Sequence, residues 1–307
     1  REPVASDMLH APDRRSLVTN LTSRRALHVA FIYFCLVALT AFIVLPLGWM
    51  LTAALKPDNV PVFTFPPEWF PTEYFNLGTF VDALTQPNEP YGRYALNSLL
   101  LASLNIIGAV LSNSLIAYAF ARLNFRGKNV LFAIVLATML LPAPVLLIPQ
   151  FLLFFNIGWY GTVDGFPAGY LPLIVPAFTG NPFFIFLLRQ YMRTIPKDLD
   201  EAARIDGAGF WTIYWRIILP LSIPALVVVA VFTFLGVWND FFGPLLYLDD
   251  PNWFTVPLAL AREVTTVGTE WNIVMAATLV AMLPPLIVYA FSQNKLMGGI
   301  ASVGIRG

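Results

Sequence analysis

Six long apolar runs alternate with shorter polar segments along the chain. None of the runs contains Asp, Glu, Lys or Arg, and each supplies the roughly 20 apolar residues that a helix needs to cross the hydrocarbon core of a bilayer. They cover residues 26–55, 94–121, 129–163, 165–188, 217–239 and 271–294. The pattern therefore predicts six transmembrane helices. The fourth run carries Pro172, Pro176 and Pro182, so we expect it to be interrupted and to need neighbouring helices that satisfy its freed carbonyls.

The polar segments divide the chain into an N-terminal arm, a membrane domain and a C-terminal tail. Residues 1–25 predict a mobile N-terminal arm, residues 26–294 the six-helix domain, and residues 295–307 a C-terminal tail. Loops on one side of the membrane cover about residues 56–94, 156–170 and 241–270. On the other side, residues 196–216 form a polar segment between the fourth and fifth runs.

Composition supports an all-α membrane protein. Of 307 residues, 58% are hydrophobic and only 12% are charged, which is far too apolar for a soluble globule. The formal net charge is zero, which argues against a nucleic-acid partner and leaves membrane lipid as the surrounding medium. Cys35 is the only cysteine and lies in the first run, so the chain has no intrachain disulfide.

The placement of charge predicts the orientation of the helices. Cations collect in the N-terminal arm, in the tail, and in the segments that join the second run to the third and the fourth to the fifth. The two joining segments carry Arg122, Arg126 and Lys128, and Arg189, Arg193, Lys197, Arg204 and Arg216. The opposite loops are mostly acidic. By the positive-inside rule, both termini and residues 196–216 are expected in the cytoplasm.

Within residues 196–216, the sequence predicts a short helix that begins after Pro196. Pro196 suits a first turn, and the carboxylates of Asp198, Asp200 and Glu201 favour the positive end of the helix dipole. Gly207 is suited to the left-handed conformation that ends such a helix, and a new turn is expected to start at Phe210.

The same segment carries a motif with fixed spacing. Glu201-Ala202-Ala203 is followed after three residues by Gly207, and after nine more by Ile217-x-Leu219-Pro220. This resembles the EAA loop of bacterial ABC importer permeases. Other stretches are similar to the carbohydrate branch of these permeases, and most similar to the smaller permease subunit of maltose-type systems. They include Asn97-Ser98-Leu99, residues 117–122, residues 236–240 and the glycine-rich residues 298–307.

The resemblance implies a fold, a function and partners. The fold would be the type I ABC importer permease fold, in the inner membrane of a bacterium. The chain would pair with a second permease subunit, expected to be a different chain, and rest on two copies of a cytoplasmic ATPase that uses ATP and Mg. An external binding protein would deliver a sugar or oligosaccharide for import. The residues implied in docking the ATPase are Glu201, Ala202, Ala203, Asp206 and Gly207.

The chain lacks features that would make it an enzyme or an energy source. No G-x-x-x-x-G-K-[ST] phosphate loop occurs. The only histidines are His10 and His28, so we expect no catalytic or metal site and no cofactor bound by this chain. The charge-free spans argue against a carrier that couples to protons or ions on its own, although that alternative and a non-transporting scaffold stay open. An uncharged route favours a neutral sugar over a glycerol phosphate.

Two groups of residues are candidates for lining a transport route. Asn97, Asn105 and Asn113 recur every eight residues and stay on one side of a helix. Trp238, Asn239 and Asp240 lie at the end of the fifth run, with Asp240 at the outer mouth. Each Asn has an alternative role in hydrogen bonds between helices, and Trp238 has one as an interfacial anchor.

Overall fold

The computed structural model describes residues 14–57, 59–69, 75–86, 90–264 and 268–304. Across these ranges the chain is helical with no regular strand, apart from one isolated bridge between Val163 and Phe166. The prediction of an all-α fold is confirmed. The longer helices are α1 (Arg14–Ala54), α3 (Tyr91–Arg122), α4 (Lys128–Thr138), α5 (Ala143–Asn156), α7 (Pro182–Thr194), α11 (Ile223–Trp238) and α14 (Trp271–Gly304).

Shorter helices connect these elements. They are α2 (Gly78–Thr85), η1 (Ala168–Tyr170), α6 (Leu171–Ile174), η2 (Val175–Phe178), α8 (Asp198–Ile205), α9 (Phe210–Ile213), η3 (Tyr214–Ile218), α10 (Leu219–Leu221), α12 (Phe242–Tyr247), η4 (Pro251–Trp253) and α13 (Val256–Glu263). Residues 14–25 of the predicted arm form the start of α1, and residues 295–304 of the predicted tail continue α14. Residues 1–13 and 305–307 lie outside the described residues.

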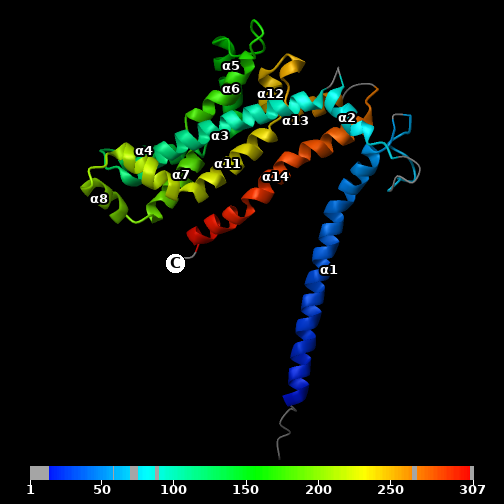
Figure 1. Ribbon diagram of the computed structural model, residues 1–307, viewed down its shortest axis with the longest axis horizontal. Coiled ribbons are helices and arrows are strands. Elements are labelled where there is room, and N and C mark those ends of the chain that lie inside the picture. Colours follow the sequence, from blue (N-terminus) through cyan, green and yellow to red (C-terminus); the bar gives the residue numbers. More distant parts are fainter. Residues whose placement is uncertain (1–13, 58, 70–74, 87–89, 265–267, 305–307) are drawn as a thin grey trace, which may run out of the picture.

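The body of the molecule is built around α3, which packs along α7 and α11, while α14 packs along α11 on the other side (Figure 1). One core lies toward the start of α3, where Tyr94 and Leu101 pack with Phe254 and Leu258. A second lies toward its end, where Tyr118 packs with Leu188, Ile213 and Tyr214. Small residues such as Ala102, Ala109 and Ala117 are buried along α3, which lets its neighbours approach closely.

Helix α1 leaves the body and extends away from it as a long arm (Figure 1). Residues 27–46 of this helix are exposed, including large apolar side chains such as Phe31, Phe34 and Phe42. Among residues 27–54, the buried side chains are those of the last turn, Thr52, Ala53 and Ala54. A helical stretch that is apolar all round and exposed in this way needs lipid or a partner chain around it.

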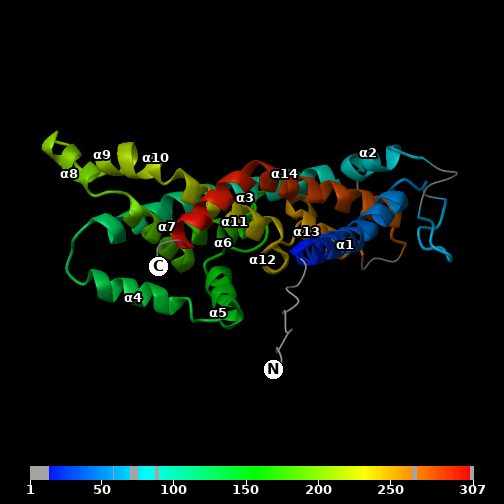
Figure 2. The ribbon, with the colours of Figure 1, turned by 90° about the horizontal axis from the view of Figure 1, so that it is seen from below.

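The third predicted span is divided into two helices. α4 and α5 are separated by residues 139–142, and they point in different directions (Figure 2). Pro142 and Pro144 explain the break, because proline lacks a donor and disfavours a helical conformation at the residue before it. No residue of α4 is buried in this chain.

The fourth and fifth predicted spans are broken as well. The fourth is assembled from η1, α6, η2 and α7, with Gly180 in a left-handed conformation before α7, as its three prolines predict. The fifth bends by 75° at Ser222 between residues 210–221 and 223–238. Pro224 has no N–H to donate to the carbonyl of Pro220, which weakens the helix at this point. The Ser222 hydroxyl also donates to the Ile218 carbonyl at 2.7 Å, a type of contact that accompanies helix bends.

Within the part of the chain that the structure describes, four helices are long and apolar enough to cross a membrane: 27–54, 91–122, 168–194 and 271–293. The bent pair 210–221 and 223–238 makes five when it is counted as one span. The first, second, fourth and sixth predicted spans are therefore each long and apolar enough for one crossing. The fifth predicted span is a bent pair of helices, and the third consists of the two short helices α4 and α5.

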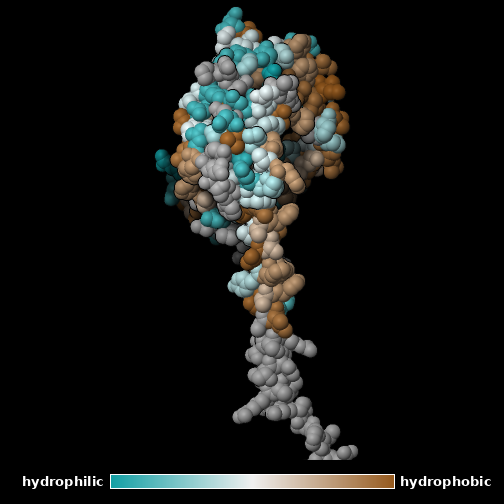
Figure 3. Space-filling view, turned by 90° about the vertical axis from the view of Figure 1, so that its right-hand side faces the viewer, coloured by the Kyte–Doolittle hydropathy of each residue, from teal (hydrophilic) through white to brown (hydrophobic). Residues whose placement is uncertain are grey.

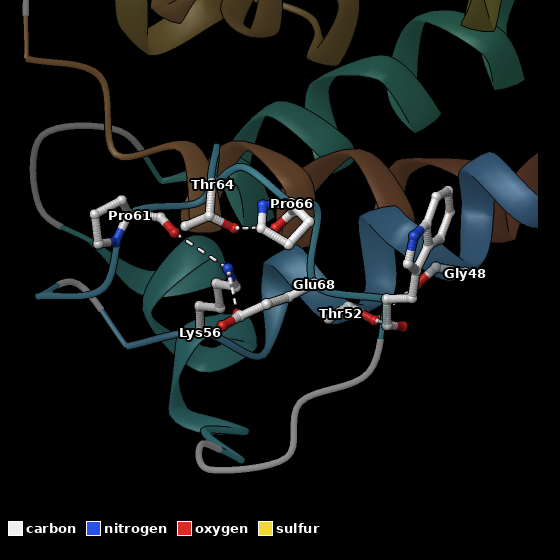
Figure 4. A network of polar contacts seen from close by, with 8 residues as sticks. Gly48, Thr52, Lys56, Pro61, Thr64, Pro66 and Glu68 are labelled. Atoms are coloured by element: carbon white, nitrogen blue, oxygen red, sulfur yellow. Dashed lines mark hydrogen bonds and ion pairs between the residues drawn. The ribbon is translucent and has the colours of Figure 1, made fainter.

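A buried lysine fixes the loop that follows α1 (Figure 4). The Lys56 side chain is only 2% exposed, and its Nζ lies 2.7 Å from Glu68 Oε2 and donates to the Pro61 carbonyl at 3.1 Å. Thr52, one turn earlier, donates to the Trp69 carbonyl at 2.8 Å. These contacts hold residues 59–69 against the end of α1. At this end of the body, hydrophilic residues cover one side of the surface and hydrophobic residues cover the other (Figure 3).

Candidate functional site

The EAA segment forms the short helix that the sequence predicts. α8 begins at Asp198, carries three carboxylates in its first turn and Arg204 in its last, and therefore matches the helix dipole at both ends. Gly207 has φ +83°, its N–H donates to the Arg204 carbonyl, and the N–H of Ala208 donates to the Ala203 carbonyl at 2.8 Å. This pair of bonds is a Schellman motif, so the predicted role of Gly207 at the helix end is confirmed.

The helix presents one side outward and one side to the body. Glu201, Ala202 and Asp206 are exposed, and Ile205 is 87% exposed. Ala203 is half-buried and packs against the second core, while Asp200 is buried. α8 lies at the extreme end of the molecule, far from α2 and the loop that Lys56 fixes (Figures 1 and 2).

Large apolar side chains enlarge the outward surface of α8. Phe210 and Trp211 at the start of α9 are 58% and 66% exposed, and the guanidinium of Arg204 lies 5.4 Å from the centre of the Phe210 ring. Together with Glu201, Ala202 and Ile205 they form what we call the EAA surface. Exposed isoleucine and tryptophan beside a carboxylate are typical of a protein contact rather than of a solvated helix.

Buried polar groups fasten the EAA segment to the body. Tyr118 Oη of α3 donates to the Phe210 carbonyl at 3.0 Å, and the hydroxyls of Ser114 and Tyr214 lie 2.8 Å apart. The rings of Tyr118 and Tyr214 are in contact at 5.2 Å between centroids. The end of α3 therefore sets the position of the segment that follows α8.

Arg122, the last residue of α3, fastens the segment that precedes the EAA residues. Its Nη2 donates to the Ile195 carbonyl at 2.7 Å, and its Nη1 lies 3.6 Å from Asp200 Oδ2. Both side chains are nearly inaccessible to solvent. Sequence reasoning assigned Arg122 to a basic loop and Asp200 to a helix dipole. It missed the pair, because only the packing of α3 beside α7 shows that the two residues meet.

A cleft of about 850 Å³ lies between the start of α4, the end of α7 and α8. Six cations and two carboxylates line it: Arg122, Lys128, Arg189, Arg193, Lys197, Arg204, Asp200 and Glu201. Six of the eight basic residues that the sequence places in two separate loops are thus brought together around one cavity.

The three asparagines of α3 are buried, and their amides bond to backbone groups. Asn97 Nδ2 donates to the Asn252 and Phe254 carbonyls, and Asn105 Nδ2 donates to the Leu173 carbonyl at 3.0 Å. Asn113 Oδ1 accepts from the Asn181 N–H at 2.6 Å. These bonds join α3 to other elements, as the alternative role in hydrogen bonds between helices requires. That the asparagines line a route stays a prediction.

The other candidates lie at the end of α11. Trp238 is buried, stacks on Phe234 and donates from Nε1 to the Ala281 carbonyl at 3.1 Å, so its indole faces the core. Asn239 is exposed. Burial raises the pKa of the Asp240 carboxyl above its ordinary value, while N–H groups of Gly243 and Phe242 act in the opposite direction. These residues and the asparagines are not brought together with the EAA surface.

The family model described as "Binding-protein-dependent transport system inner membrane component" matches residues 113–298, more than half of the chain. The matched range includes the whole EAA segment. The chain belongs to this family. It is thus an ABC transporter permease with several membrane-spanning helices.

Curated relatives cover almost the whole chain. The probable ABC transporter permease protein YurM of Bacillus subtilis is 30% identical over 281 residues, which is 90% of this chain and 87% of that one. The arabinooligosaccharides transport system permease protein AraQ of Halalkalibacterium halodurans is 30% identical, covering 88% and 94%. The sn-glycerol-3-phosphate transport system permease protein UgpE of Yersinia pestis is 31% identical, covering 91% and 98%.

A solved structure confirms the fold. A chain of a bacterial ABC transporter involved in the import of the acidic polysaccharide alginate aligns with a TM-score of 0.77 at 20% identity, covering 89% of this chain and 98% of that chain. The resemblance to ABC importer permeases that the EAA motif indicated is thereby confirmed for family and fold.

Proposed function

We propose that this permease is the membrane-spanning subunit of an ATP-driven importer of a neutral sugar or oligosaccharide. The observation that carries the proposal is the EAA surface: an exposed Glu201 and Ala202 on a rigidly capped helix, flanked by exposed Ile205 and Trp211, at one extreme of the molecule. An exposed surface of this kind needs a protein partner. The chain has no phosphate loop with which to bind a nucleotide itself. A separate ATPase is the partner that supplies energy there.

In this proposal the chain crosses the membrane six times, with both termini and α8 in the cytoplasm. The basic segments around α8 support this orientation through the positive-inside rule. The divided third span, α4 and α5, becomes one crossing when a second permease subunit or lipid covers its exposed apolar sides. The exposed apolar length of α1 is available to the same partner.

The proposed assembly contains a second, different permease subunit, two copies of the ATPase and an external binding protein. Family membership supports the binding protein, because the family is named for transport that depends on one. ATP and Mg would be bound by the ATPase. Glu201 would pair with a cation in a groove of the ATPase, and Ala202 and Ala203 would allow close approach. Asp206 and Gly207 would set the end of the docking helix.

The substrate class is proposed from two observations. The six apolar runs carry no Asp, Glu, Lys or Arg, which suits a neutral, hydroxyl-rich solute. Among the relatives, AraQ belongs to an arabinooligosaccharide system. The relative UgpE, from an sn-glycerol-3-phosphate system, makes a glycerol phosphate the second candidate.

Glu201→Lys tests the proposed coupling. In vesicles reconstituted with the full assembly, this variant is expected to lose the ATPase on purification and to lose ATP-driven uptake by at least tenfold, because a buried like-charge contact costs several kcal/mol. Uptake of a labelled neutral disaccharide and of sn-glycerol 3-phosphate is measured in parallel to separate the two substrates.

Asp82→Lys is the matched control, since it reverses an exposed carboxylate on α2 at the opposite end of the molecule. It is expected to keep the ATPase bound. Normal ATPase recruitment and uptake by Glu201→Lys would disprove the coupling role.

A further inference from the structure

Four cations of the cleft beside α8 have no carboxylate partner among the described residues. Lys128 Nζ donates to the Leu123 carbonyl at 2.7 Å, and Arg189 Nε donates to the Phe120 carbonyl at 3.2 Å while its guanidinium stacks on Phe132. Arg193 and Lys197 are exposed at the rim. The two carboxylates of the cleft lie on α8, where Asp200 is paired with Arg122 and Glu201 lies one turn before Arg204. The lining therefore has four positive charges in excess.

The mutual repulsion of these cations affects the pKa of Lys128. Burial lowers the pKa of its ammonium below the ordinary value, and the positive charges of Arg189, Arg193 and Lys197 lower it further. A folded chain that holds like charges around a cavity of this size gains from any anion that enters it.

The start of α4 adds to the attraction for an anion. This helix of 11 residues begins after Gly127 in a left-handed conformation, has no side-chain cap and no acidic residue in its first turn. Asn129 and Val130, in that turn, line the cleft. The positive end of the helix dipole and its unsatisfied N–H groups therefore add to the field of the four cations.

An apolar strip continues from the cleft along α4. Val130, Leu131 and Ile134 are 64%, 48% and 55% exposed. A molecule with an anionic head and a hydrocarbon tail can occupy both surfaces at once.

We propose that this cleft is a binding site for a phosphate-bearing anion, supplied in the membrane by the headgroup of an anionic phospholipid whose acyl chains lie along α4. The site goes beyond the proposed transport function and does not depend on which solute is carried. Guanidinium and ammonium groups suit phosphate oxygens, and basic cavities between helices on the cytoplasmic side are typical sites for such headgroups.

The test uses the purified, delipidated full chain in neutral detergent. Native mass spectrometry measures retention of phosphatidylglycerol and of zwitterionic phosphatidylcholine, and thermal unfolding measures stabilisation by inorganic phosphate. The double variant Arg193→Gln/Lys197→Gln removes two exposed cations of the cleft. The control Arg126→Gln/Arg216→Gln removes two exposed cations that do not line it.

The proposal predicts that phosphatidylglycerol binds in preference to phosphatidylcholine. Its apparent dissociation constant should rise at least tenfold in the cleft variant and less than threefold in the control. Stabilisation by inorganic phosphate that only the cleft variant loses, without a lipid preference, would support the site with a soluble phosphate as its ligand. If neither probe distinguishes the two variants, the cations serve another partner, such as acidic residues of the ATPase, and the proposal fails.

Discussion

Arg122 shows how a single side chain links the membrane body to the EAA surface. Its guanidinium contacts the Ile195 carbonyl before α8 and the Asp200 carboxylate inside α8. Arg122 Nε and Asp200 Oδ1 are both buried without a hydrogen-bond partner. A pair placed in this way stabilises mainly by preventing an isolated buried charge, so the loss of either partner is costly.

We predict that Arg122→Gln lowers the free energy of unfolding by about 3 kcal/mol, because it leaves Asp200 buried and unpaired. Arg126→Gln, which changes an exposed arginine four residues later, should change it by less than about 0.5 kcal/mol. Thermal unfolding in detergent, followed by tryptophan fluorescence, measures both. Adding Asp200→Asn to Arg122→Gln should restore part of the loss, and equal effects of the two arginine variants would refute the pairing.

Predictions for single residues are correct where they depend on neighbouring residues in the sequence. The left-handed Gly207 and the new turn at Phe210 follow from a few neighbouring residues and are confirmed. Arg122 with Asp200, and Tyr118 with Phe210, join residues 78 and 92 positions apart. Such contacts depend on helix packing, which no local pattern specifies.

At the scale of elements, the end of α8 decides how the EAA surface is presented. The helix stops because Gly207 adopts φ +83°, and a Cβ added there would meet nothing within 4 Å. Substitution therefore costs backbone strain and creates no clash. Gly209, two residues later, also has open space around it, but its φ is −77°.

Gly207→Ala should destabilise the chain by about 1 kcal/mol, since an L-residue in the left-handed region is strained by about that amount. Gly209→Ala is the matched control and should be neutral or slightly stabilising, because alanine accepts its backbone conformation. Thermal unfolding in detergent measures both changes. Equal losses in the two variants would show that left-handed strain at Gly207 does not determine the end of α8.

Hydrophobic runs predicted the number of apolar segments better than their shapes. The runs at 94–121 and 271–294 correspond to continuous helices, α3 and α14. The apolar run at 217–239 did not predict the 75° bend at Ser222, although Pro220 and Pro224 flank Ser222. A proline allows a kink, but the neighbouring helices determine whether and how far the chain bends.

At the scale of the whole molecule, the loop fixed by Lys56 and the EAA surface lie at opposite ends. Buried Lys56 and its exposed partner Glu68 fix the loop at one end, and the EAA surface lies at the other (Figure 1). Between them, α3 runs the length of the body and contributes to both cores. One continuous helix therefore joins the core beneath the EAA surface to the core at the opposite end.

The exposed sides of α1, α4 and α5 could not be explained from this chain alone. Their apolar residues predicted membrane spans correctly in composition, but the described residues provide no core for them to join. Helices of this kind are completed by lipid and by a second subunit, so the arrangement of the full assembly is outside what one sequence specifies.

Docking of an ATPase on the EAA surface can be measured by crosslinking in the assembled transporter. In a Cys35→Ala background, Ala202→Cys places the sole thiol on α8, and Asn156→Cys places it at the exposed end of α5. A thiol-to-lysine crosslinker should capture the ATPase from Ala202→Cys and not from Asn156→Cys. Capture of the ATPase from both positions alike, or from neither, would contradict the account.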